Sequence, residues 1–296
     1  MTTLSNSSAK AARLAPIFMI LGMLLVPVMD GTAKLLVRDY PVAQVVWGRY
    51  FFHLLSLLPL FIIFREKLSL KPARPKLQFV RALFLLGDTA LFFAALSFIP
   101  LTNGKAVFFV APLIMTALAP LILSEKVGWH RWAAVLVGFS GTLFILKPEA
   151  EGEWLGYLLA FGSAAFYAIY LLLTRKLSTT SSPLNTLLYT AVVGTLIMTL
   201  LVPFDWKTPD LFGWTLMLAM GILGTLSHFF IIKAFEGGDA SHLAPFTYSE
   251  IVSATIFGVV VFGHFPGMTT WVGISIVMAS GLYILRREQR LQRQRS

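Results

Sequence analysis

Cysteine is absent from the 296 residues, and charged residues make up only 13% of them. The missing thiol excludes disulfide bonds, thiolate metal sites and cysteine nucleophiles. An ordinary soluble domain carries about 25% charged residues. A chain that is 57% hydrophobic, with a mean hydropathy of +0.77, would leave much apolar surface exposed in water. The composition therefore predicts a protein that is largely surrounded by lipid.

The formal net charge of +10 at pH 7 would suit a nucleic-acid-binding protein only if the basic residues shared one soluble face. The lysines and arginines instead lie in short segments between apolar runs and at the two ends of the chain. We therefore expect no nucleic-acid partner. Because no phosphate-cradling glycine loop, histidine-rich metal motif or GxSxG motif occurs, we also predict no catalytic residues, no metal and no cofactor.

The first apolar run, Leu14 to Leu36, follows a polar segment that carries Lys10 and Arg13. A signal peptide also begins with basic residues, but its apolar region is only about 7–15 residues long and ends at a small-residue cleavage site. This run is longer, and no such site followed by a soluble domain is present. We interpret it as an uncleaved first span, with residues 1–13 as a cytoplasmic tail.

Apolar segments long enough to cross a bilayer recur along the whole chain. A helix needs about 20 residues to cross a hydrocarbon core about 30 Å thick. Prolines, glycines and charged residues separate the segments and end helices. We predict an all-α integral membrane protein with ten spans, at residues 14–36, 41–64, 77–98, 101–123, 128–146, 154–174, 184–203, 211–234, 241–262 and 271–285.

The basic residues also predict how these spans are oriented. If the N-terminus is cytoplasmic, the outer side receives only Arg38, Lys105, Lys147 and Lys207, and the other loop and tail lysines and arginines lie inside. Such an excess on one side is the positive-inside signature. We predict a multi-pass protein of the bacterial inner membrane with both termini in the cytoplasm. The basic tail, residues 286–296, would also suit lipid binding, but a topology signal is the commoner meaning.

The chain contains an internal repeat. At an offset of about 139 residues the first five spans align with the last five, and identical residues meet at Tyr50 and Tyr189, Leu57 and Leu196, Ala95 and Ala234, Trp132 and Trp271, and Ile145 and Ile284. Because each copy has an odd number of spans, the second copy must enter the membrane in the opposite orientation. We predict two inverted five-helix repeats, 14–147 and 154–285, which is an architecture of alternating-access carriers.

A family resemblance rests on residues spread over nearly the whole chain: Met29 to Lys34, Tyr40–Pro41, Trp47 to Arg49, Ala94 to Pro112, Ser124 to Lys126, Trp132 to Gly141, Ala234 to Pro245 and Trp271 to Gly281. Through them the chain resembles the ten-helix, two-repeat EamA proteins of the drug/metabolite transporter superfamily. Glu125 in the first repeat matches a glutamate that the family often has in both repeats. His264 occupies the corresponding place in the second repeat, so the resemblance implies no role for a glutamate there. It implies a secondary transporter of a small organic metabolite.

Ionisable side chains inside the spans cost about 2.5–3.5 kcal/mol each on insertion scales. Asp30 and Lys34 lie one helical turn apart in the first span, and Arg49 lies at a similar depth in the second. We predict an Asp30–Lys34 or Asp30–Arg49 pair that faces the bundle interior, with a structural or a transport role. Lys105 lies near the outer boundary, so we expect its side chain to extend outward.

Three further ionisable residues, Asp88, His228 and Glu250, lie near the middle of their spans. Histidine and a carboxylate can each exchange a proton when a cavity changes sides, so proton coupling is our hypothesis. The alternative is that these residues only pair with one another and fix helix register.

The resemblance implies a central cavity lined by the first, third, fourth, sixth, eighth and ninth spans. The candidates for contact with substrate are then Asp30, Asp88, Asn103, Tyr167, Tyr170, His228, Tyr248 and Glu250, with Lys34 and Arg49 as further binding or coupling candidates.

We predict that the chain is a secondary transporter of a small metabolite, working by alternating access. Family members carry amino acids, nucleoside-like compounds and vitamins such as riboflavin. Because 14% of the residues are aromatic and can stack on a planar solute, we expect an aromatic amino acid or a riboflavin-like solute. The alternative is an integral-membrane enzyme, although the short basic loops offer no room for a catalytic cluster. A channel is disfavoured because no repeated selectivity ring is found. The direction of transport and the oligomeric state stay open.

Overall fold

The computed structural model describes residues 2–65, 67–69, 72, 74–123, 129–145, 153–177, 182–237, 243 and 246–293. Every regular element in these ranges is a helix, as predicted. In chain order they are α1 (Thr2–Leu36), α2 (Val42–Phe64), α3 (Pro75–Leu96), α4 (Leu101–Phe108), α5 (Ala111–Leu123), α6 (Trp129–Ile145), α7 (Glu153–Leu177), α8 (Pro183–Leu201), the 3₁₀ helix η1 (Val202–Asp205), α9 (Leu211–Gly237), α11 (Ser249–Phe262) and α12 (Met268–Arg293).

Seven helical segments of this part of the chain are long and apolar enough to cross a membrane. They are Leu14–Leu36, Val42–Phe64, Pro75–Leu96, Leu101–Ile122, Glu153–Thr174, Pro183–Asp205 and Leu211–Ala234, and shorter apolar helices cover Trp132–Thr142, Ser249–Phe262 and Met268–Ile284. The protein is therefore a multi-pass membrane protein. The start of the predicted ninth span, at residue 241, and both limits of the fifth, at 128 and 146, lie outside the described residues.

The predicted fourth span, residues 101–123, is not one continuous helix. It consists of α4 and α5, with Phe109 and Val110 between them. Pro112 explains the break because its nitrogen cannot donate the helical hydrogen bond to the carbonyl of Phe108, and its ring would clash with that carbonyl. The amide of Leu113 donates to the carbonyl of Val110, three residues back, at 2.9 Å, and the ordinary α-helical pattern resumes with the amide of Ile114 on the same carbonyl at 3.0 Å.

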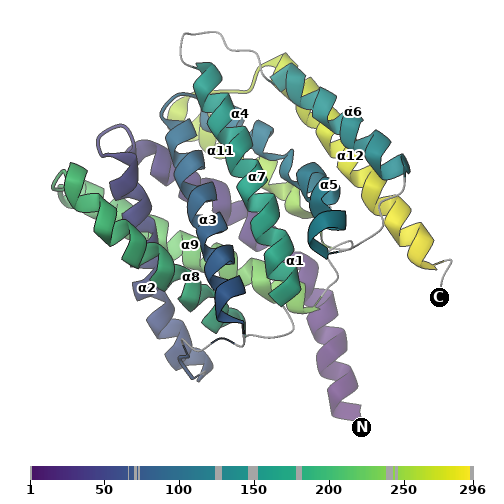
Figure 1. Ribbon diagram of the computed structural model, residues 1–296, viewed down its shortest axis with the longest axis horizontal. Coiled ribbons are helices and arrows are strands. Elements are labelled where there is room, and N and C mark those ends of the chain that lie inside the picture. The colour runs from purple at the N-terminus through teal and green to yellow at the C-terminus, as the bar shows by residue number, and fades with distance from the viewer. Residues whose placement is uncertain are drawn as a thin grey trace.

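Several helix contacts occur twice when α1, α2, α3, α5 and α6 are matched, in chain order, with α7, α8, α9, α11 and α12. Thus α1 packs against α9 and α11, and α7 packs against α3 and α5. In the same way α2 contacts α9, and α8 contacts α3. Two further pairs, α2 with α8 and α6 with α12, join matched helices directly. The helices α6 and α12 lie side by side along one edge of the bundle (Figure 1).

A set of polar contacts ties together two connections at one end of the bundle. The Gln44 side chain donates to the carbonyl of Lys207 and accepts from its amide, at 2.7 and 2.9 Å. Asp210 accepts from the amide of Gly213 at 2.7 Å and from the hydroxyl of Tyr40 at 3.1 Å. These hydrogen bonds, that of Gly213 first, hold the pKa of Asp210 below its ordinary value. The α1–α2 connection and the start of α2 are thereby joined to the connection between η1 and α9.

Candidate functional site

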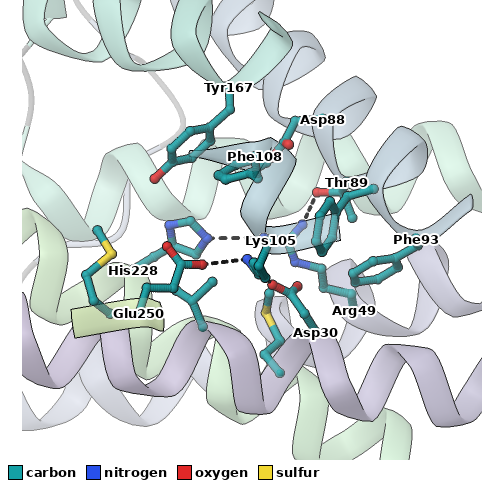
Figure 2. A pocket seen from close by; sticks show the side chains of 14 residues that line it. Asp30, Arg49, Asp88, Thr89, Phe93, Lys105, Phe108, Tyr167, His228 and Glu250 are labelled. Carbon is teal, nitrogen blue, oxygen red and sulfur yellow. Dashed lines mark hydrogen bonds and ion pairs between the residues drawn. The ribbon is translucent and has the colours of Figure 1, made fainter. Parts of the chain in front are cut away.

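A cavity lies in the middle of the bundle, and the empty space between its wall atoms, including space open to the outside, is about 450 Å³. Side chains from seven helices, α1 to α4, α7, α9 and α11, surround it. Figure 2 draws these side chains and labels ten of the residues. The lining residues are Met23, Val26, Met29, Asp30, Arg49, Asp88, Thr89, Phe92, Phe93, Lys105, Phe108, Tyr167, His228 and Glu250.

Lys105 joins two carboxylates at the cavity wall. Its Nζ lies 2.5 Å from Asp30 Oδ2 and 2.5 Å from Glu250 Oε1, and only 3% of the side chain is exposed (Figure 2). The same ammonium group faces the rings of Phe92 and Phe108, at 4.6 and 4.9 Å from their centroids. We call Asp30, Lys105 and Glu250 the Lys105 triad. It holds α1, α4 and α11 together.

The expectation that Lys105 extends outward is therefore wrong. That expectation was based only on the depth of Lys105 in the membrane. The depth was right, because Lys105 lies only one turn inside the start of α4 at Leu101. The direction in which the side chain leaves the helix decides its position, and that direction leads to Asp30 and Glu250.

The predicted pairing of Asp30 with Lys34 or Arg49 is also wrong, since Asp30 pairs with Lys105. Lys34 Nζ donates to the carbonyls of Leu96 and Ile99, at 2.9 and 2.7 Å. The last carbonyls of a helix receive no hydrogen bond from within that helix. Lys34, which reaches the end of α3 from α1, therefore finds acceptors there. Lys34 does not line the cavity.

Arg49 is a buried cation at the cavity wall. It donates to the hydroxyl of Thr89 and to Nε2 of His228, the latter at 3.1 Å, and it faces the rings of Tyr50 and Phe93. Because a guanidinium has no acceptor atom, His228 Nε2 must accept this hydrogen bond. The Nε atom of Arg49 has no partner, and no carboxylate among the described residues lies within 4 Å of the guanidinium.

Asp88 is a buried carboxylate on the same cavity, one residue before Thr89. Its Oδ1 accepts from the hydroxyl of Ser163 on α7 at 2.6 Å, and the side chain is buried. Within the part of the chain that is described, no ammonium or guanidinium nitrogen lies within 4 Å of it. Asp88 and Arg49 therefore face one cavity without forming an ion pair.

The charges on the cavity wall do not balance. Three carboxylates, those of Asp30, Asp88 and Glu250, and two cations, Arg49 and Lys105, give a formal charge of −1 when His228 is neutral. Lys105 takes up two of the carboxylates, which leaves Arg49 and Asp88 able to bind groups of opposite charge on a solute. The rings of Phe108 and Tyr167 add an apolar, aromatic surface.

Six of the ten predicted site residues line the cavity, and Lys34, Asn103, Tyr170 and Tyr248 do not. Asn103 donates from Nδ2 to the Tyr157 hydroxyl at 3.0 Å. Tyr248 packs against Phe109, with 5.9 Å between ring centroids, and Tyr170 lies 5.2 Å from the guanidinium of Arg81. All four are on cavity-forming helices or next to them but face neighbouring helices instead.

The sequence analysis also did not select the buried Arg81 outside the cavity. Besides Lys105, the cavity residues that it missed are Met23, Val26, Met29, Thr89, Phe92, Phe93 and Phe108. A helical spacing could have indicated some of them. Phe92 follows Asp88 by four residues and Arg81 precedes it by seven, so both share its face of α3.

Comparison with known proteins gives two matches to one family. The model of the EamA-like transporter family matches residues 13–147 and again residues 154–286. The chain is 32% identical over 250 residues to a protein of Rickettsia bellii named "S-adenosylmethionine uptake transporter", covering 83% of this chain and 84% of that one. It is 35% identical over 198 residues to a "Riboflavin transporter" of Vibrio cholerae, covering 66% of each chain.

A solved structure, described only as a crystal structure of a protein, has a similar fold. Its TM-score is 0.65 at 18% sequence identity, and the likeness covers 96% of this chain and 99% of the other. At this identity the similarity concerns the fold alone.

Proposed function

Because this chain belongs to the EamA-like transporter family, we propose that its small-metabolite substrate crosses the membrane through the cavity lined by Arg49, Asp88 and the Lys105 triad. The relatives are named as transporters, and this chain is a transporter of a small metabolite. The finer proposal is that the cavity opens to the two sides of the membrane in turn and that the solute leaves it chemically unchanged, so that the protein is not an enzyme.

The proposed mechanism has two inverted five-helix halves, residues 14–147 and 154–285, that move relative to each other. The double match to one family and the helix pairs that recur when the halves are exchanged support it. A shared midplane site between inverted repeats is a common transporter design. We place residues 1–13 and 286–296 on the cytoplasmic side of a bacterial inner membrane, in keeping with the excess of basic residues there and with both chain ends leaving one side of the bundle in Figure 1.

The unpaired Arg49 and Asp88 are the observation that favours one substrate class. We propose a solute with an amino-acid carboxylate for Arg49, a cationic centre for Asp88 and a ring system for Phe108 and Tyr167. S-adenosylmethionine, which a relative's name includes, carries a carboxylate, an ammonium, a sulfonium and an adenine ring, and its single net positive charge complements the cavity charge of −1. Aromatic amino acids also carry a carboxylate, an ammonium and a ring, but they have no sulfonium and no net charge.

Riboflavin is the second candidate, because relatives bear its name. Riboflavin would place a larger planar ring system in the cavity than S-adenosylmethionine, but it carries no charge. Arg49 and Asp88 would then gain no group of opposite charge, and Arg49 Nε would stay without an acceptor. An unsatisfied buried polar group costs about 1–3 kcal/mol. We therefore expect weaker transport of riboflavin than of S-adenosylmethionine.

Uptake by the purified chain in proteoliposomes tests the proposed substrate class. Labelled S-adenosylmethionine, tryptophan and riboflavin are offered separately, and the solute inside is then extracted and identified. We expect S-adenosylmethionine to enter fastest and intact, and riboflavin to enter slowest. Fast riboflavin uptake without S-adenosylmethionine uptake would overturn the proposed class, and a chemically altered product would favour an enzyme. Liposomes without protein give the background.

The same assay with a pH gradient tests proton coupling. Since His228 Nε2 accepts a hydrogen bond from Arg49, a proton on that nitrogen would remove the acceptor and release Arg49 to bind a carboxylate. We expect a pH gradient to speed uptake, and we expect this gain to disappear in His228→Gln, Asp88→Asn or Glu250→Gln. A gain that persists in all three single variants would rule out coupling through these groups.

A further inference from the structure

Arg81 is a second buried arginine, outside the cavity and without an assigned role. Its side chain is 0% exposed. It lies on α3, seven residues before Asp88, so that it shares that residue's face of the helix about 10 Å closer to the start of α3.

Besides the Tyr170 side chain on α7, four neutral groups on three helices accept hydrogen bonds from this guanidinium. They are Gln78 Oε1 on α3 at 3.1 Å, Thr174 Oγ1 on α7 at 3.4 Å, and, on α8, the Thr186 carbonyl at 2.9 Å and the Thr190 hydroxyl. Among the residues that the structure describes, no carboxylate lies within 4 Å of Arg81. Within the described part of the chain, neutral hydrogen-bond acceptors and the Tyr170 ring surround its positive charge.

A pair of tyrosines connects Arg81 to the cavity. The Tyr170 ring centroid lies 5.2 Å from the Arg81 guanidinium and 5.7 Å from the ring centroid of Tyr167. Tyr167 lines the cavity. Arg81 thus lies between the cavity and the end of the bundle at which α3 begins and α7 ends.

A buried cation without a counter-ion needs an explanation, because desolvation of its charge is costly and a neutral side chain could link the same hydroxyl groups. Guanidinium groups bind carboxylates through two parallel hydrogen bonds. We propose that Arg81 is a second binding station for the carboxylate of the substrate, on the path between the cavity and that end of the bundle. The inference rests on the proposed function, since it requires a solute with a carboxylate.

The station would work by an exchange of partners. When α3 and α8 separate to open this end of the cavity, Arg81 loses Thr186 and Thr190 on α8 and receives the carboxylate that Arg49 releases. When the helices close again, the neutral oxygens replace the carboxylate. Arg81 would then speed passage of the solute without being part of its binding site in the cavity.

Transport of a matched pair of solutes by Arg81→Gln tests this role. We expect S-adenosylmethionine uptake to fall about tenfold or more, while uptake of decarboxylated S-adenosylmethionine and equilibrium binding of S-adenosylmethionine stay near the wild-type values. Thr190→Val, which removes one neutral partner and keeps the charge, should transport S-adenosylmethionine like the wild type. An equal loss for both solutes, or equal losses in the two variants, would mean that Arg81 only links helices.

Charge-selective labelling tests the station without any solute. Since the chain has no cysteine, Thr190→Cys places a single thiol beside Arg81. An anionic and a cationic methanethiosulfonate reagent are applied from the side at which α3 begins, and each rate is divided by the reagent's rate with a free thiol. We expect the anionic reagent to react preferentially, and this preference to vanish when Arg81→Gln is added. No reaction, or no preference for the anionic reagent, would overturn the proposal. If the anionic reagent is clearly preferred but the protein takes up no S-adenosylmethionine, only the proposed substrate is refuted.

Discussion

Replacement of Lys105 by methionine is expected to lower the free energy of unfolding by about 3–5 kcal/mol and to abolish transport. The substitution keeps most of the side-chain volume but removes the ammonium that lies 2.5 Å from both Asp30 and Glu250. Two carboxylates would remain in the interior without a cation, and α1 and α11 would lose their link through α4. Unfolding of the detergent-solubilised protein and uptake by proteoliposomes measure the two effects.

A matched lysine and a charge-neutral triad serve as controls. Lys76→Met changes an exposed lysine near the start of α3, so its effect should stay within about 0.5 kcal/mol. The triple variant Asp30→Asn, Lys105→Met, Glu250→Gln removes all three charges, and it should recover most of the lost stability without recovering transport. If Lys105→Met were as stable as Lys76→Met, the triad would not hold the helices together.

Replacement of Arg49 by glutamine should weaken S-adenosylmethionine binding by about 2–5 kcal/mol, which is roughly 30-fold or more in Kd. The guanidinium is buried, its Nε is unpartnered and no described carboxylate neutralises it, so we expect the solute carboxylate to supply the missing charge. Arg49→Lys should also bind weakly, because an ammonium group does not reproduce the planar donor fork. Calorimetric titration of the solubilised protein measures these affinities.

Decarboxylated S-adenosylmethionine is the control ligand for Arg49. It lacks the group that Arg49 binds, so Arg49→Gln should change its affinity little. Arg81→Gln is the control variant, since Arg81 lies outside the cavity and should leave the affinity for S-adenosylmethionine unchanged. An equal loss of affinity for both ligands in Arg49→Gln would indicate a damaged cavity and not a lost carboxylate contact.

The positions of most helices could be predicted because a bilayer imposes a length on each apolar run, and because prolines and charges mark the ends. Hydropathy gave no sign of the break between α4 and α5, since Phe109 and Val110 are as apolar as their neighbours. The break follows from a hydrogen bond that Pro112 cannot make. Pro112 could have been used to predict the break, but a proline alone is not a sufficient sign, because Pro59 lies inside a continuous helix of the same protein.

The site was less predictable because sequence indicates the depth of a residue in the membrane but not the direction of its side chain. Helices that are apolar on every side have no polar face to reveal which residues point inward. Depth was enough to select Asp30, Asp88, His228 and Glu250, which do line the cavity. It misplaced Lys105 and Lys34, whose partners lie on helices distant in sequence. Roles in binding or coupling stay predictions for all of them.

A structure of the protein with S-adenosylmethionine bound tests the account most directly. We expect the carboxylate on the Arg49 guanidinium, a cationic centre beside Asp88 and the adenine ring against Phe108 or Tyr167, with the Lys105 triad intact. A solute bound outside this cavity, or bound within it with its carboxylate away from Arg49, would contradict the account.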